Sequence, residues 1–317
     1  MSFSTRLMLP SDGDEVAELI FNSLNVWHEK NRGFKLVPGT WEILRIFPRV
    51  YEALDPNCCV TVVDTETNRI AGACFFHPRS THTSLGILAV HPDFFGKRAG
   101  SMLVKYIADF TDRRNQPLRL VSGATNIDSF SLYSKFGFVP ECFYQDVAVA
   151  MYHPVEVNAP DGTEIRDATP DDVPAIAALE RRITGLDREK DYRFFLENTD
   201  KIWHTSVMTS SAGIIGVMAS VCDPGSNMLG PGVAQTEEQA AALIRHELNA
   251  YHLHRPVVLI PSAAIKLRQA LYDIGGKNCD LHISQVRQPG GKQAASGRPC
   301  FPPSSGLVFP TFMPESG

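Results

Sequence analysis

The segment from Val90 to Leu103, Val-His-Pro-Asp-Phe-Phe-Gly-Lys-Arg-Ala-Gly-Ser-Met-Leu, has the composition of an anion-binding turn. It follows an expected strand, 85–90, and leads into an expected helix, 97–112. The first backbone N–H groups of a helix, together with the helix dipole, attract negative charge, and a pyrophosphate suits such a place. A Gly-x-x-x-Gly turn alone is equally typical of an ordinary connection between a strand and a helix. A second motif must therefore decide between the two interpretations.

That second motif combines Asn126, Tyr133 seven residues later, and the pair Gly137-Phe138. A short apolar run before Asn126 predicts a buried strand, and the residues up to Lys135 predict a helix. Gly137 stands where that helix is expected to end. The motif therefore places Asn126 and Tyr133 on or beside one short helix.

Together the two segments resemble the GNAT acetyltransferase superfamily, whose signatures are V-x-P-x-x-(Q/R)-G-x-G-x-(G/A) and N-x-x-A-x-x-L-Y-x-x-x-G-F. The close match covers residues 84–140. The resemblance implies the α/β (α+β) class and two tandem GNAT-like domains, each a mixed, mainly antiparallel twisted sheet flanked by helices. It also implies an N-acetyltransferase that moves an acetyl group from acetyl-CoA, the acyl donor, to a primary amine of a small molecule or peptide. The expected mechanism is direct attack in a ternary complex.

The resemblance further implies which residues contact the cofactor. Three strand residues would pair with pantetheine, the turn and the helix start would hold the pyrophosphate, and residues of the second motif would contact the cofactor arm. In chain order these residues are Leu88, Ala89, Val90, Phe95, Gly96, Lys97, Arg98, Ala99, Gly100, Ser101, Asn126, Ser129 and Tyr133. Two of them depart from the family pattern, because Phe95 replaces Gln or Arg and Arg98 replaces Gly. Arg98 could crowd the backbone against the phosphates or grip them with its guanidinium.

The acid and the base of the transfer have different support in the sequence. The resemblance implies that Tyr133 gives a proton to the departing thiolate, while a core tyrosine is the alternative interpretation. Many relatives use a carboxylate on the strand before the V-x-P motif, but residues 84–90 contain none. His77 and His82 in the preceding turn are the candidate bases, because an imidazole accepts a proton near neutral pH. The alternatives are that both are solvent-exposed turn residues, or that a water relay acts on an already deprotonated amine.

The second half of the chain repeats the first half. Residues 117–137 and 256–276 align without a gap at an offset of 139, which pairs Tyr133 with Tyr272 and Asn126 with Ile265. At an offset of 140, Lys97 and Arg98 correspond to Glu237 and Glu238. Carboxylates at that place would repel a pyrophosphate. We therefore expect no acetyl-CoA in the second half, and a structural or acceptor-shaping role for it.

The domain boundary is expected in the turn-rich stretch Met151–Gly162. This divides the chain into a catalytic GNAT acetyltransferase domain, 1–156, and a degenerate GNAT-like domain, 157–317. Residues 289–310 are rich in Pro and Gly, and we expect either an ordered tail over the second domain or a flexible end. The sequence does not indicate an oligomeric state.

Composition narrows the function classes. Of the 317 residues, 44% are apolar and 21% are charged, which is typical of a globular protein. No apolar run approaches the ~20 residues of a membrane span, and the N-terminus lacks the pattern of a secretory signal, so we expect a cytoplasmic location and no membrane partner. A net charge of −5 without a basic block argues against nucleic acid.

Cysteine and histidine spacing gives no sign of a metal site. The seven cysteines contain no C-x-x-C pair, which fits reduced thiols better than a disulfide framework. His246-Glu247 lacks the second histidine of an H-E-x-x-H helix, so no metal is expected.

Two other functions stay open beside the acetyltransferase. One is a non-catalytic acyl-CoA-binding or sensor protein, motivated by the missing carboxylate and by Arg98. The other is a scaffold in which both halves have lost their cofactor site.

Overall fold

The computed structural model describes residues 2–251, 254–291 and 306–310. The first half runs in the order strand, two helices, three strands, helix, strand, helix, strand. Its elements are β1 (Phe3–Leu7), α1 (Gly13–Arg32), α2 (Ile46–Leu54), β2 (Cys59–Asp64), β3 (Ile70–Pro78), β4 (Thr83–Val90), α3 (Ala99–Arg113), β5 (Leu118–Gly123), α4 (Ile127–Lys135) and β6 (Val139–Ala148).

The second half repeats this order and adds one short strand at its end. Its elements are β7 (Glu164–Asp167), α5 (Val173–Thr184), α6 (Glu189–Glu197), β8 (Trp203–Ser210), β9 (Gly213–Asp223), β10 (Ser226–Ala234), α7 (Glu237–Leu248), β11 (Val257–Pro261), α8 (Ile265–Tyr272), β12 (Lys277–Arg287) and β13 (Leu307–Phe309). The predicted internal repeat is therefore present at the level of whole elements.

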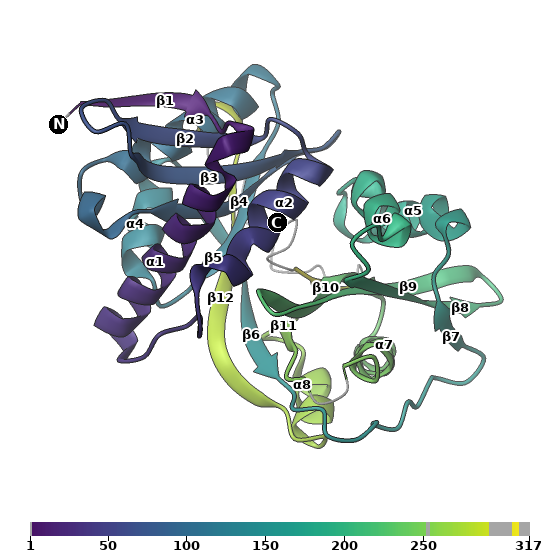
Figure 1. Ribbon diagram of the computed structural model, residues 1–317. Coiled ribbons are helices and arrows are strands. Elements are labelled where there is room, and N and C mark those ends of the chain that lie inside the picture. The colour runs from purple at the N-terminus through teal and green to yellow at the C-terminus, as the bar shows by residue number, and fades with distance from the viewer. Residues whose placement is uncertain (1, 252–253, 292–305, 311–317) are drawn as a thin grey trace.

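All these strands form one sheet in the order β1-β2-β3-β4-β5-β12-β6-β11-β10-β9-β8-β7, with β13 beside β10 (Figure 1). The two halves exchange their last strands. β12, from the second half, pairs with β5, and β6, from the first half, pairs with β11. β6 and β12 also pair with each other at the centre. Each half therefore depends on the other to complete its sheet.

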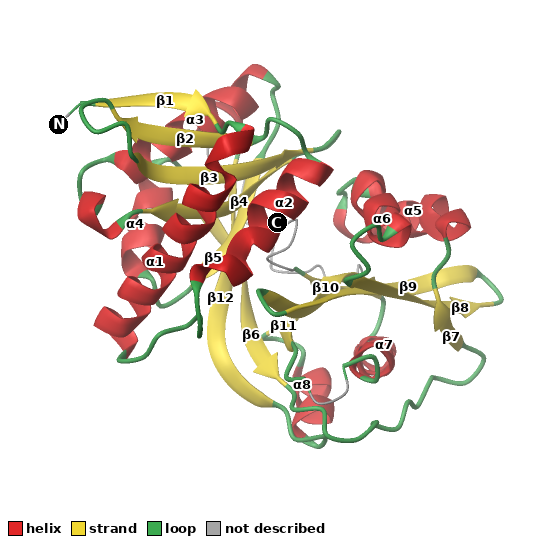
Figure 2. Ribbon diagram, viewed as in Figure 1, coloured by secondary structure: helices red, strands yellow, loops and turns green. Residues whose placement is uncertain are grey.

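Helices cover both faces of this sheet (Figure 2). One continuous core lies under α1, α2, α5 and α6, and it joins apolar side chains of both halves. On the opposite face, α3 and α4 cover one core while α7 and α8 cover another. Strands β2 and β3 are buried almost throughout, because helices pack on both of their faces.

The start of each half shows how the sequence specifies the repeat. In the first half Arg6 of β1 forms an ion pair with Asp12, which lies just before α1. In the second half Arg166 of β7 donates to Asp172, which lies just before α5 (2.7 and 2.8 Å). In both places the aspartate also accepts a backbone N–H at the helix start, which holds the helix against its strand.

A buried ionic cluster joins the two halves on the α2 and α6 side. Arg79, in the turn between β3 and β4, donates its Nε to Asp191 of α6 (2.7 Å) and its Nη1 to Asp55 (3.0 Å). Lys190 of α6 also donates to Asp55 (2.7 Å). Removing one partner would leave a buried charge uncompensated, so this cluster fixes α6 against the β3–β4 turn.

The connection between β6 and β7 contains the expected linker, and the boundary between residues 156 and 157 remains a prediction. No helix in the described residues is long and apolar enough to cross a membrane. The expectation of seven reduced thiols is wrong at Cys142, which is disulfide-bonded. Residue spacing does not reveal which thiols meet in space. The free cysteines of the described residues are Cys58, Cys59, Cys74, Cys222 and Cys279, and Cys300 lies outside those residues.

Candidate functional site

A gap opens between β4 and β5 in the first half. These strands are parallel, and among the described residues they pair only at Thr83 with Leu118 and Ser84 with Arg119. Beyond that point the strands separate, although β4 continues to Val90. The other edge of β4 stays paired with β3 up to Val90. Residues 88–90 therefore turn one backbone edge toward the gap, where an extended ligand can form hydrogen bonds with it.

The N-terminus of α3 follows this strand after the turn of residues 91–98 and offers backbone donors. The first backbone hydrogen bond of the helix runs from the N–H of Met102 to the carbonyl of Arg98. The N–H groups of Ala99, Gly100 and Ser101 therefore precede the helical hydrogen bonds, and no side chain caps this helix. These donors and the positive end of the helix dipole can bind an anion, which is the role that the sequence analysis predicts for them.

The turn before α3 has an unusual backbone. Gly96 has φ +74° and Arg98 has φ +72°. The left-handed region suits glycine, and an arginine there is strained. This explains why the family pattern has glycine at the position of Arg98. Phe95, Lys97 and Arg98 are all exposed, so their side chains leave the backbone of the turn accessible.

Asn126 and Ser129 meet at the start of α4. Asn126 is the N-cap, and its Oδ1 accepts the N–H of Ser129 (3.1 Å). Both predicted residues thus lie together, and both are only partly buried. Asn126 has a structural role in capping in addition to the cofactor contact that the resemblance implies.

Tyr133 lies on the α3 and α4 face of the sheet. Its ring belongs to the core under these helices and packs against Phe138 at 5.6 Å between centroids. Burial raises the pKa of its phenol above the usual value. The group is therefore protonated at neutral pH, as a proton donor must be.

His77 lies on the opposite face, under α2. Its Nδ1 is 2.8 Å from Oδ2 of Asp55, and the imidazole is fully buried against Tyr51. Its Nε2 has no hydrogen-bond partner among the described residues. This atom faces β4, because a Cβ added to Gly86 would lie 2.9 Å from it. An imidazole held at Nδ1 by a carboxylate, with Nε2 directed at the edge of the gap, has the arrangement of a general base.

Asp55 is a site residue that the sequence analysis did not identify. Burial alone would raise the pKa of its carboxyl, but the hydrogen bond from His77 and the charge of Arg79 outweigh it and hold the pKa far below the usual value. Asp55 is therefore ionised. Since it precedes a strand and belongs to no motif, only its contacts reveal its role.

His82, the second predicted base, is also fully buried. Its Nδ1 lies 2.9 Å from the hydroxyl of Thr81, in the turn before β4. This turn is at the end where β4 and β5 are still paired, whereas Gly86 lies beyond the last pair. The geometry therefore favours His77 over His82. Neither histidine is the solvent-exposed turn residue of the alternative interpretation.

Hydrogen bonds correct the register of the internal repeat. The N–H of Asn126 binds the carbonyl of Gly123, and the N–H of Ala264 binds that of Pro261. The offset here is 138, not the predicted 139, so the counterpart of Asn126 is Ala264 rather than Ile265. At the end of α4 the N–H groups of residues 136–138 make the same bonds as those of residues 274–276 at the end of α8, at the same offset.

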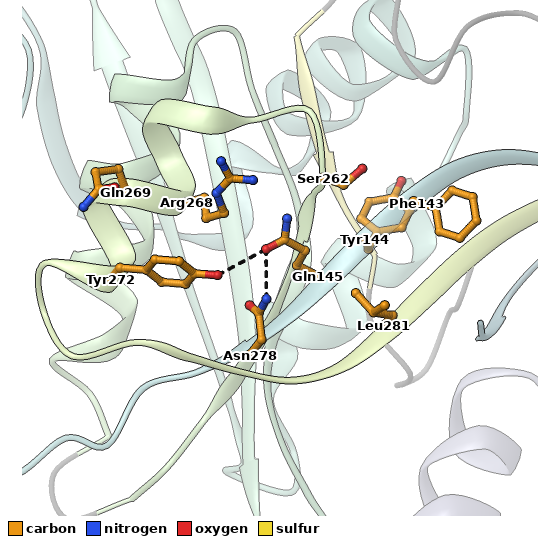
Figure 3. Close-up of a pocket in the computed structure, with 9 residues that line it drawn as sticks. All are labelled: Phe143, Tyr144, Gln145, Ser262, Arg268, Gln269, Tyr272, Asn278 and Leu281. Atoms are coloured by element: carbon orange, nitrogen blue, oxygen red, sulfur yellow. Dashed lines mark hydrogen bonds between the residues drawn. The ribbon is translucent and has the colours of Figure 1, made fainter. Parts of the chain in front are cut away.

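The new register also separates the two tyrosines. The counterpart of Tyr133 is Leu271, which is fully buried, whereas Tyr272 is 38% exposed. Figure 3 shows Tyr272 in a pocket of about 720 Å³ between α8, β6 and β12, where its hydroxyl lies 3.4 Å from Gln145 Oε1. No predicted cofactor residue lines this pocket. At this position of the repeat, therefore, the first half has a buried phenol and the second half has a leucine.

The start of α7 differs from the start of α3. Only residues 235–236 connect β10 to α7, whereas residues 91–98 connect β4 to α3, so the anion-binding turn has no counterpart. Thr236, the N-cap of α7, accepts the N–H of Gln239, whose side chain accepts the N–H of Thr236 in return. Of the donors that are open in α3, this capping box occupies the counterpart of the Ser101 N–H, which is the N–H of Gln239. The first helical bonds of α3 and α7 correspond at an offset of 138, so the counterpart of Arg98 is Thr236 and not the predicted Glu238. Glu237 and Glu238 are the first two residues of α7.

Known proteins share this fold. Residues 56–140 match the family model described as Acetyltransferase (GNAT) domain. A GCN5-related N-acetyltransferase from Sphaerobacter thermophilus is similar in structure over 93% of this chain and 98% of its own, with TM-score 0.65 and 18% identity. The tandem GNAT protein from the clavulanic acid biosynthesis pathway is similar over 92% of this chain and 100% of its own, with TM-score 0.55 and 12% identity. The chain has the tandem GNAT fold.

A protein from Pyrococcus horikoshii is similar in structure over 99% of this chain and 96% of its own, with TM-score 0.71 and 13% identity. A search of curated protein sequences finds no significant match. The matched segment contains β2 to β5 and α4, so it includes the gap, the start of α3, His77 and Tyr133. The matched segment thus contains every candidate site residue that the sequence analysis names.

Proposed function

We propose that the first domain transfers an acetyl group from acetyl-CoA to a primary amine of a small molecule or peptide. The observation that carries this proposal is the β4–β5 gap, which has an uncapped helix N-terminus at its end and a candidate acid and base on its two faces. Acetyl-CoA would place its pyrophosphate on the donors of residues 99–101 and its pantetheine arm along residues 88–90. Asn126 and Ser129 would flank the arm from α4.

The two faces of the gap separate the two proton transfers. The amine would enter from the α1 and α2 face and attack the thioester carbonyl in a ternary complex. As the C–N bond forms, His77 Nε2 accepts the proton that the nitrogen loses, directly or through one water. When the C–S bond breaks, Tyr133 on the other face donates its proton to the leaving thiolate. The products are the acetylated amine and free CoA.

The second domain would support this chemistry from outside the gap. Asp55 orients His77, and Arg79 and Lys190 in turn hold Asp55. Lys190 belongs to the second domain, as does Asp191, the other partner of Arg79. We propose this support as the role of the degenerate domain, which has no open anion-binding turn of its own.

The His77–Asp55 pair also distinguishes catalysis from an acyl-CoA sensor. A sensor needs the gap and the helix N-terminus but has no use for a buried imidazole with an unpartnered Nε2 beside β4. Burying a polar atom without a partner costs roughly 1–3 kcal/mol. A chemical role for that atom gives a reason for the cost.

Calorimetric titration with acetyl-CoA tests the cofactor step. Wild type is expected to bind one equivalent per chain, and Asn126→Ala to bind at least about tenfold more weakly. Asn126→Asp keeps the cap but loses the side-chain amide, so it separates capping from cofactor contact. Thr236→Ala, which removes a cap in the second domain, serves as the matched control and should bind as wild type. Absence of binding by wild type at millimolar cofactor would reject the proposal.

A further inference from the structure

The C-terminal strand β13 lies in the second domain's counterpart of the cofactor gap. It pairs antiparallel with β10, with Gly232 opposite Phe309, Val233 opposite Val308 and Ala234 opposite Leu307. The other edge of β10 is already paired with β9. Within the part of the chain that the structure describes, β11 pairs with β10 only at Met228 and Leu229. β13 therefore enters the space where β10 and β11 have separated.

The strand registers show that this space matches the gap of the first domain. The pairing of β3 with β4 is interrupted by a register shift, which lies between the pair Cys74–Leu88 and the pair Phe76–Leu85. β9 and β10 show the same irregularity, pairing at Met218 with Gly232 and resuming at Ser220 with Leu229. The residues at the shift in β9 and β10 are each 144 positions after those at the shift in β3 and β4. Residues 232–234, which bind β13, are thus the counterparts of residues 88–90, to which the pantetheine arm is assigned.

The fit of this segment is specific along its whole length. Phe309 is fully buried in the core under α7 and α8, and Val308 packs on the opposite face. At one end Gly306 has φ +106°, and a Cβ there would lie 2.5 Å from the carbonyl oxygen of Ala234. At the other end a Cβ on Gly230 would lie 2.7 Å from the carbonyl oxygen of Pro310. Glycine on the strand and glycine on its partner allow the two backbones to meet.

The same space does not suit a nucleotide cofactor. The capping box of Thr236 and Gln239 occupies two of the backbone N–H groups at the start of α7, those of Thr236 and Gln239. Glu237 and Glu238 place two carboxylates in its first turn. An extended peptide needs none of these donors, because its own backbone pairs with the edge of β10.

We infer that the second domain is a strand-binding domain, in which the cleft that holds pantetheine in a GNAT fold holds an extended peptide with a buried aromatic side chain. Its ligand in this protein is residues 306–310 of the same chain. The expected ordered tail over the second domain is thus present for these residues, while 292–305 lie outside the described residues. This inference is independent of the acetyl transfer proposed for the first domain.

Hydrogen exchange of the full-length chain tests the inference. Gly306→Val introduces a clash with Ala234 and should release the strand, so the amides of residues 232–234 should exchange at least about tenfold faster. Gly290→Val is the matched control, since Gly290 also has a positive φ but has open space around it. A synthetic peptide of residues 304–312, added to the Gly306→Val variant at millimolar concentration, should restore protection. The same peptide with Phe309→Asp should not.

Each result decides the inference. Unchanged exchange in Gly306→Val would overturn the docking of the strand. Faster exchange that the wild-type peptide fails to reverse would overturn peptide binding by the cleft. A second equivalent of acetyl-CoA bound by Gly306→Val would show that the emptied cleft is still a cofactor site, which also contradicts the inference. None of these measurements requires acetyltransferase activity.

Discussion

The imidazole of His77 and the carboxylate of Asp55 meet at 2.8 Å in a fully buried place under α2. The histidine comes from β3 and the aspartate from the connection between α2 and β2. Their contact leaves Nε2 of His77 directed at Gly86, beside the β4–β5 gap. This relationship carries the catalytic part of the proposed function, and it can be tested directly.

His77→Gln should lower kcat by about 10²–10⁴-fold, because a glutamine cannot accept the proton of the amine. The dependence of kcat/KM on pH that a general base gives the wild-type enzyme should also disappear in the variant. Steady-state kinetics between pH 5.5 and 9 measures both effects. Asp187→Asn, which weakens the domain interface without touching His77, is the control. A variant with the wild-type pH profile would assign the base elsewhere.

Tyr133→Phe should lower kcat by about 10–100-fold while leaving the acetyl-CoA dissociation constant unchanged, because only the proton donor is lost. The ring would keep its packing against Phe138. Thiol release and calorimetry on the same preparation separate the two quantities. Tyr272→Phe should leave both quantities unchanged, since the hydroxyl of Tyr272 lies in the pocket of Figure 3. Equal turnover by Tyr133→Phe and wild type would show that Tyr133 is a core residue without a catalytic role.

Arg98→Gly should raise the free energy of unfolding by about 0.5–1 kcal/mol. Arginine is strained at φ +72°, and relief of that strain exceeds the entropy cost of a glycine in the unfolded chain. Lys97→Gly removes the same charge at a neighbouring position outside the left-handed region, so it should lower stability instead. Urea unfolding of both variants checks the opposite signs. If both variants are destabilised, strain at Arg98 is not a significant cost.

We expect His204 to make the free energy of unfolding depend on pH. A hydrogen bond with the buried Glu247 raises the pKa of His204 from 6.5 to about 9, although burial opposes the shift. The folded state therefore favours the protonated ring. This stabilisation is fully present below pH 6.5 and is lost as the pH rises toward 9. Urea unfolding of wild type and His204→Gln should give a stability difference that shrinks across this window. A difference that is constant with pH would contradict the ion pair.

The sequence by itself determined the parts that depend on local spacing. The turn of residues 90–103 and the helix from Asn126 to Lys135 are specified by glycine, capping and apolar positions close together in the chain. Their structure matches the prediction within a few residues. The repeat was also visible, because element order survives when individual residues change.

Only the tertiary structure decided what depends on residues far apart. Identities favoured an offset of 139 because Tyr272 and Gly276 resemble Tyr133 and Gly137, but Gly275 is the helix-ending residue with positive φ, as Gly137 is. Backbone hydrogen bonds, not residue identities, fix a register. The His77–Asp55 pair, the exchange of β6 and β12, and the place of β13 each join distant segments. No local pattern in the sequence encodes such contacts, since burial and strand pairing select them when the chain folds.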